Sequence, residues 1–214
     1  MYLVERHIIK SNNPLYKELD NVCFLSKNLY NKALYIVRQH YFSTKEYLSY
    51  FKLNKLLIES KDVDYYALNT KVSKGTLRLL DRNFKSFFSL LKKKKSKNHN
   101  KSVRIPRYLD KQGKYISVFG KDAVSKRFLK KGLIKFSNIS NVVKTNIRLE
   151  VLKEVRVLPR NNHYILEVVY IKEDKISIEN NGRYASIDLG LNNLATVSSN
   201  VVKSFISLDR KSVV

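Results

Sequence analysis

The sequence predicts an α+β protein in which an antiparallel β-barrel or sandwich is interrupted by a helical module. Three observations indicate this architecture. Apolar residues alternate in the first ten residues, recur every three or four residues between about 11 and 100, and return to short alternating runs after Val103. The chain has 214 residues, 43% of them hydrophobic, so it can bury a core in one or two small domains.

The first strand is expected within residues 1–10, and a long helix is expected to begin at Asn13-Pro14. Proline suits the first helical position because its φ angle is already helical, and Asn13 can cap the free amides. The apolar residues that follow are spaced to share one face of this helix: Leu15, Leu19, Val22, Leu25, Leu29, Ala33 and Ile36.

Two further helical regions follow. Ser43 and Glu46 have the spacing of a capping box, which predicts the start of a second helix there. A third region is expected over about residues 65–95, with Gly75 weakening its middle and marking a break between two helices. The lysine-rich block at residues 92–97 is interpreted as a solvated helix end or loop.

The second half of the chain is predicted to be mostly β. Asn161-Asn162 is a turn signal between two of the best strands, and the polar stretch at residues 173–182 is expected to be a linker. Strands are expected at residues 115–119, 133–136, 147–151, 155–158 and 164–171.

The charge balance points to a polyanionic partner. Lys and Arg number 42 against 18 Asp and Glu, a formal net charge of +24, which would be strongly self-repelling without a polyanion such as a nucleic acid. A ribosomal or other passive basic protein and a membrane-surface protein remain as alternatives. No apolar run approaches the roughly 20 residues needed to cross a bilayer, so we expect a cytoplasmic, nucleoid-associated protein.

Cysteine and histidine offer little for metal chemistry. The single cysteine, Cys23, cannot form a disulfide framework or a four-cysteine zinc site within this chain, and its place on an apolar helical stripe favours core packing. The four histidines are scattered and show no pairing typical of a metal site: His7, His40, His99 and His163.

One motif could carry chemistry. Residues 184–197 read as a strand ending in Asp188, a glycine turn and a returning strand. A carboxylate at such a bend can bind a divalent cation, as phosphoryl-transfer nucleases require. The ordinary structural alternative is an aspartate bonded to its own turn amides.

In context, residues 187–196 resemble the first RuvC motif of the TnpB family, transposon-encoded RNA-guided DNA endonucleases related to type V CRISPR nucleases. The resemblance extends over roughly residues 2–206. Four further segments resemble the family's first recognition helix, the aromatic end of its helical lobe, the return into its wedge barrel and the strands before its nuclease domain: residues 29–39, 82–88, 105–109 and 157–170.

The resemblance implies a domain plan. Residues 1–10 and 101–180 would form the wedge β-barrel, residues 11–100 a helical recognition lobe, and residues 183–214 the start of an RNase H-like RuvC domain. Asp188 matches the first of three catalytic acids, which in the family hold two divalent cations such as Mg²⁺.

The sequence ends at Val214, before the positions of the second and third RuvC acids and of the family's cysteine zinc element. We therefore expect a truncated nuclease in which Asp188 binds metal only weakly and DNA is not cleaved by this chain alone. Whether the chain is an enzyme stays open.

The resemblance also implies guide RNA and target DNA as partners, with base pairing reading the sequence and the protein holding the backbone. Tyr30, Tyr65 and Tyr66 are candidates for stacking on bases, with packing as the alternative for each. Candidate phosphate contacts are Lys71, Lys74, Arg78, Arg82 and Lys85.

Two other functions compete with this one. A passive basic RNA-binding protein would need only the positive charge. An actin-like or sugar-kinase ATPase also has an apolar-Asp-apolar-Gly motif, but there the motif normally opens the fold and is followed by a small hydroxyl residue. Here Leu191-Asn192-Asn193 follows, which disfavours the ATPase.

Overall fold

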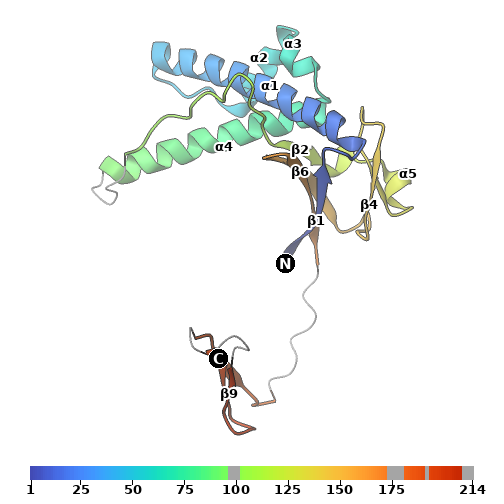
Figure 1. The fold of residues 1–214 in the computed structure, drawn as a ribbon. Coiled ribbons are helices and arrows are strands. Elements are labelled where there is room, and N and C mark those ends of the chain that lie inside the picture. Colours follow the sequence, from blue (N-terminus) through green and yellow to red (C-terminus); the bar gives the residue numbers. More distant parts are fainter. Residues whose placement is uncertain (96–101, 173–180, 191–192, 209–214) are drawn as a thin grey trace. The chain divides into compact units, whose positions relative to one another are not determined.

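The computed structural model describes residues 1–95, 102–172, 181–190 and 193–208. The chain forms two compact units, Met1–Lys172 and Glu173–Val214, each of which is described by itself (Figure 1). The first unit combines helices with an antiparallel sheet, so the prediction of a mixed α and β protein is confirmed.

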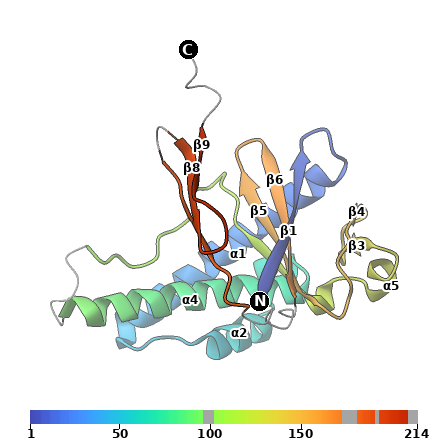
Figure 2. The same ribbon diagram turned by 90° about the horizontal axis from the view of Figure 1, so that it is seen from below.

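The first unit is built on an antiparallel four-stranded sheet in the order β1-β6-β5-β2. Figure 2 shows β1, β6 and β5 of this sheet side by side. β1 pairs with β6 along its whole length, from Tyr2 opposite Ile171 to Lys10 opposite His163. The prediction that the first strand joins strands from beyond the helical region is therefore confirmed. The four strands are β1 (Tyr2–Lys10), β6 (His163–Ile171), β5 (Leu152–Arg160) and β2 (Ser117–Gly120).

The β5–β6 hairpin forms the centre of the sheet. Its turn is Asn161-Asn162, as predicted, and Asn162 adopts a left-handed φ of 62°, which asparagine tolerates better than most residues. The prediction of a strand at residues 147–151 is wrong. There the chain makes a turn in which the Leu152 amide donates to the Arg148 carbonyl oxygen at 3.2 Å, leading directly into β5.

The residues that connect β2 to β5 in the sequence form a smaller substructure. It contains the turn η1 (Lys121–Ala123), the short helix α5 (Lys126–Leu129) and a two-stranded sheet of β3 (Leu133–Lys135) and β4 (Val142–Lys144). Among the described residues, these strands do not join the larger sheet, and β1 and β2 remain at its opposite edges. The expected barrel is therefore corrected to an open sheet, because four strands are too few to close on themselves.

Helices α1 and α4 pack against the sheet, and α2 and α3 pack against these two helices. Asn13 Oδ1 accepts from the Leu15 amide at 2.9 Å, which confirms the predicted cap. The capping box at Ser43 is wrong: α1 continues through Ser43, whose hydroxyl donates back to carbonyl oxygens within the helix, and ends only before Lys45, which has a φ of 61°. The helices are α1 (Leu15–Thr44), α2 (Tyr50–Glu59), α3 (Val63–Tyr66) and α4 (Thr70–Lys95).

Gly75 does not break a helix, contrary to the prediction. α4 continues through it, and a Cβ atom at this position would lie 3.0 Å from the Val118 carbonyl oxygen and 3.4 Å from the Val118 Cβ. A side chain at this position would therefore press on the β2 backbone, which favours glycine where α4 crosses β2. The part of the lysine block from residue 96 onward lies outside the described residues.

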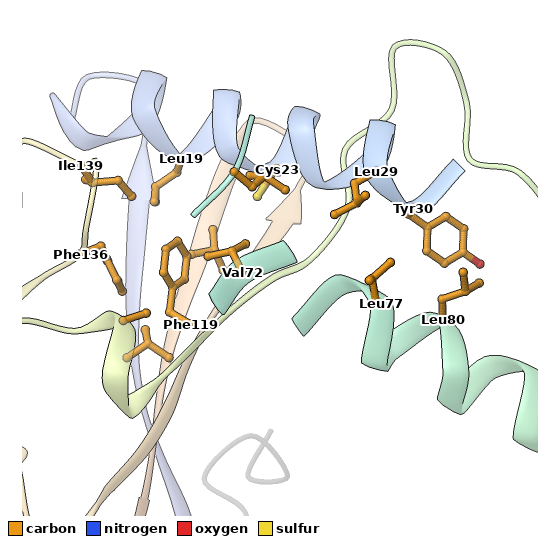
Figure 3. Close-up of a cluster of buried hydrophobic side chains, with 14 of the residues drawn as sticks. Leu19, Cys23, Leu29, Tyr30, Val72, Leu77, Leu80, Phe119, Phe136 and Ile139 are labelled. Carbon is orange, nitrogen blue, oxygen red and sulfur yellow. The ribbon is translucent and has the colours of Figure 1, made fainter. Parts of the chain in front are cut away.

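The core lies between α1, α4 and the sheet (Figure 3). Phe119 of β2 and Phe136 pack with ring centroids 4.3 Å apart. Cys23 is fully buried, and this burial raises the pKa of its thiol to about 12, so it is a core residue as expected. Core side chains drawn in Figure 3 include Leu19, Leu29, Val72, Leu77, Leu80 and Ile139.

The second unit is a three-stranded antiparallel sheet in the order β7-β8-β9. Asp188 lies opposite Thr196 in the antiparallel β7–β8 pair, so the predicted strand and returning strand are confirmed. Residues 191–192 of the predicted turn lie outside the described residues. Residues 173–180 of the predicted linker lie outside the described residues. The strands are β7 (Ala185–Asp188), β8 (Asn193–Ser199) and β9 (Phe205–Leu208).

Candidate nucleic-acid interface

The five predicted phosphate contacts lie on one face of α4. At 3.6 residues per turn their positions fall within an arc of about 80° and extend along about 21 Å of helix. The helix is amphipathic, because its opposite face is buried against the core through Val72, Leu77, Leu80 and Phe84. All five cations are exposed or half-buried: Lys71, Lys74, Arg78, Arg82 and Lys85.

The net charge is concentrated in the same unit. Residues 173–214 contain five Lys and Arg and five Asp and Glu, so residues 1–172 carry the whole formal charge of +24. A positive field of this size raises the local concentration of polyanions and speeds their association.

The part of this face from Lys71 to Arg82 forms one wall of a cavity of about 270 Å³ between α4 and the β2 edge of the sheet. The structure brings four of the five predicted cations together there, together with two acids that the sequence did not single out. The cavity is lined by Lys71, Lys74, Gly75, Arg78, Arg82, Val118, Gly120, Asp122 and Glu154.

The cations of this wall are held by different contacts. The Arg78 guanidinium lies over the Tyr50 ring, 5.4 Å from its centroid, which orients it without neutralising its charge. Lys71 Nζ lies 3.4 Å from Asp122 Oδ2, but both side chains are largely exposed, and such pairs contribute little. Lys71 and Arg78 therefore remain suited to binding an anion.

Lys85 lies outside this cavity and has a stronger partner. Its Nζ is 2.7 Å from Asp81 Oδ2, and Asp81 also accepts from the Tyr47 hydroxyl at 2.7 Å and the Tyr50 amide at 3.2 Å. Burial raises the pKa of Asp81, but the hydrogen bonds from Lys85, Tyr47 and Tyr50 outweigh it and hold that pKa below its ordinary value. Lys85 is thus the weakest of the five candidates.

Tyr30 is corrected from a stacking residue to a core residue. It is only 3% exposed, and its ring lies 4.5 Å from that of Tyr115. Burial raises the pKa of Tyr30 and that of Tyr115, the latter to about 12. Tyr65 is also buried and donates its hydroxyl to Asn54 Oδ1 at 2.9 Å, whereas Tyr66 is exposed.

Sequence reasoning missed an extended segment, residues 102–116, that runs along α1. The Asn31 side chain bonds both backbone groups of Leu109, at 2.8 and 3.0 Å. Lys27 Nζ donates to the Lys111 carbonyl oxygen at 2.7 Å. This attachment leaves Arg104 and Arg107 exposed beside α1. Asn31 lies off the apolar stripe of α1, on the same side of the helix as Lys27, so the apolar pattern gave no signal for this attachment.

Asp188 is exposed in β7. Within the described parts of the chain, no three His, Cys, Asp or Glu side chains are placed to hold one metal ion, and the expectation of Mg²⁺ stays a prediction. No helix of the described residues is both long and apolar enough to cross a membrane.

Comparisons with known proteins include distant matches to solved structures. No family model and no curated protein matches the chain. The chain is similar to a chain in a cryo-EM structure of a Cas12f1–sgRNA–target DNA complex, with 13% identity and a TM-score of 0.37 over 98% of this chain and 57% of that one. A CRISPR-Cas12f ternary complex has a chain with 14% identity and a TM-score of 0.40, over 91% and 49%. The chain spans about half the length of these proteins.

Proposed function

We propose that residues 1–172 bind nucleic acid along the basic face of α4, as the recognition part of an RNA-guided DNA nuclease of the TnpB type. The observation that carries this proposal is the row of five cations on one exposed helix face, in the unit that holds the whole net charge of +24. The ligands would be guide RNA and the target DNA paired with it.

The geometry of α4 suits a nucleic-acid backbone. Duplex DNA carries one negative charge per about 1.7 Å of its axis, so a cation row about 21 Å long passes several phosphates. Contacts of this kind supply affinity without sequence information, which in guided systems comes from base pairing. The protein therefore needs charge and shape on this face rather than base-reading side chains.

The domain plan and the metal site belong to the same proposal. Residues 1–10 and 101–180 would act as the wedge, residues 11–100 as the recognition lobe, and residues 183–214 as the beginning of a RuvC domain. Asp188, at the end of β7, would be a Mg²⁺ ligand. A single carboxylate holds a divalent cation weakly, and two-metal hydrolysis needs further ligands about 3.5–4 Å apart.

The test is the salt dependence of binding to an RNA–DNA duplex. Replacing Arg78 and Arg82 together by alanine should flatten the slope of log affinity against log salt by about 1.4–1.8, since each lost phosphate contact removes about 0.7–0.9. The matched control replaces Lys126 and Arg127 of α5, both exposed, and removes the same charge from another element. Equal slopes for the two double variants would reject α4 as the interface.

A passive basic RNA-binding protein is the second candidate, favoured by the wide spread of positive charge, which includes the exposed Arg104 and Arg107 beside α1. A guided protein should retain an RNA transcribed from its own locus at about 200 mM salt, where nonspecific binding is weak. Equal retention of an unrelated RNA of the same length would favour the passive protein.

A further inference from the structure

The cavity between α4 and β2 contains negative as well as positive groups. Lys74, Arg78 and Arg82 approach it from α4, whereas Glu154 and Asp122 line it from the sheet side. Carboxylates beside a site for phosphate alone would weaken binding by like-charge repulsion. Their presence suits a ligand that offers an anion to one wall and a hydrogen-bond donor to the other.

Glu154 is the better placed acceptor of the two. Its Oε1 accepts from Arg156 Nε at 2.6 Å and lies 2.5 Å from Arg156 Nη2, so the carboxylate is held in one orientation on β5. Asp122 is 72% exposed and pairs with Lys71, so it is less fixed. A carboxylate that is already held in one orientation loses little conformational entropy when it binds a hydrogen-bond donor, which favours binding.

Gly120 provides room beside Glu154. The two residues lie opposite each other in the β2–β5 ladder, and a Cβ atom at Gly120 would meet nothing within 4 Å. Its φ of −63° and ψ of 164° are extended values that any residue can adopt. The backbone therefore does not require glycine here, and the missing side chain leaves the cavity open.

We infer that this cavity takes one ribonucleotide of a bound RNA strand. Its phosphate would bind the α4 cations and its ribose 2′-hydroxyl would donate to Glu154. The 2′-hydroxyl is the neutral donor that RNA has and DNA lacks, and it lies next to the backbone phosphates. A volume of about 270 Å³ is near the lower end for ligand cavities, which fits one nucleotide rather than a stretch of duplex. This inference rests on the proposed function and adds a preference for RNA.

The experiment measures the affinity of the full chain for short single strands of one sequence, made as RNA, as DNA and as 2′-O-methyl RNA. Wild type should bind RNA about tenfold more tightly than either of the others, since one hydrogen bond to a charged group is worth about that ratio. Glu154→Ala should bring the RNA to DNA ratio close to one.

Gly120→Val is a second variant, which fills the cavity without changing any charge and should also abolish the RNA preference while keeping the salt slope. Thermal unfolding checks that both variants fold, and if Gly120→Val does not, Glu154→Ala decides. Wild-type binding that is salt-dependent but equal for RNA and DNA would overturn this inference and leave the proposed function standing. Binding insensitive to salt and to loss of Arg78 and Arg82 would overturn the proposed function itself.

Discussion

The close crossing of α4 over β2 makes a testable prediction about Gly75. In an open helix, Gly→Ala stabilises by about 1 kcal/mol. Here the new Cβ would lie 3.0 Å from the Val118 carbonyl oxygen, which is backbone of a strand paired with β5 and can give way only if β2 moves. Overpacking of this kind costs about 1–3 kcal/mol. We therefore expect Gly75→Ala to lower the free energy of unfolding by about 1 kcal/mol.

The assay is thermal or denaturant unfolding, in which a loss of that size lowers the Tm by about 2–4 °C for a domain of this length. Gly120→Ala is the matched control, because its Cβ meets nothing within 4 Å and its φ is negative. That change should be neutral or stabilise by about 0.4–1 kcal/mol. If Gly75→Ala proves as stable as Gly120→Ala, α4 does not press on β2 as described.

Three further outcomes can be measured. Asp81→Asn should lower the free energy of unfolding at neutral pH by about 1 kcal/mol, because a neutral amide accepts more weakly from the Tyr47 hydroxyl, the Tyr50 amide and Lys85. Because folding lowers the pKa of Asp81, the difference in stability between wild type and variant should disappear as pH falls through that pKa in unfolding titrations. Tyr164→Phe, which removes the 2.6 Å hydroxyl donor to Asp20, should cost about 1–2 kcal/mol by the same assay. Asp188→Ala should leave nucleic-acid affinity in anisotropy titrations unchanged or slightly higher, since it removes a negative charge from a basic protein; a large loss would contradict this.

Local signals in the sequence predicted several features correctly. The Asn13 cap and the Asn162 turn each depend on residues within a few positions of one another. The sequence also predicted that the first strand pairs with a strand from beyond the helical region, and the structure identifies that partner as β6.

Features that depend on distant segments were missed or misread. Gly75 reads as a helix breaker until Val118 is placed beside it. For Tyr30 the sequence left stacking on bases and packing open, and packing against Tyr115, 85 positions later in the chain, decides between them. The capping-box pattern at Ser43 fails because the Ser43 hydroxyl donates to the Gln39 and His40 carbonyl oxygens of α1 instead of capping a following helix. Propensity decides such positions only where tertiary packing does not.

The two glycines on either side of the cavity explain why its chemistry escapes sequence reasoning. Gly75 lets α4 approach β2 closely, which places Arg78 across from acids that follow it by dozens of residues in the chain. Gly120 leaves the space between them empty. A basic helix alone would bind any polyanion. Glu154 adds a hydrogen-bond acceptor opposite this helix, and DNA has no 2′-hydroxyl to donate to it. Selectivity for RNA at this cavity is therefore a property of the packing between helix and sheet, and loosening that packing should weaken selectivity before it weakens binding.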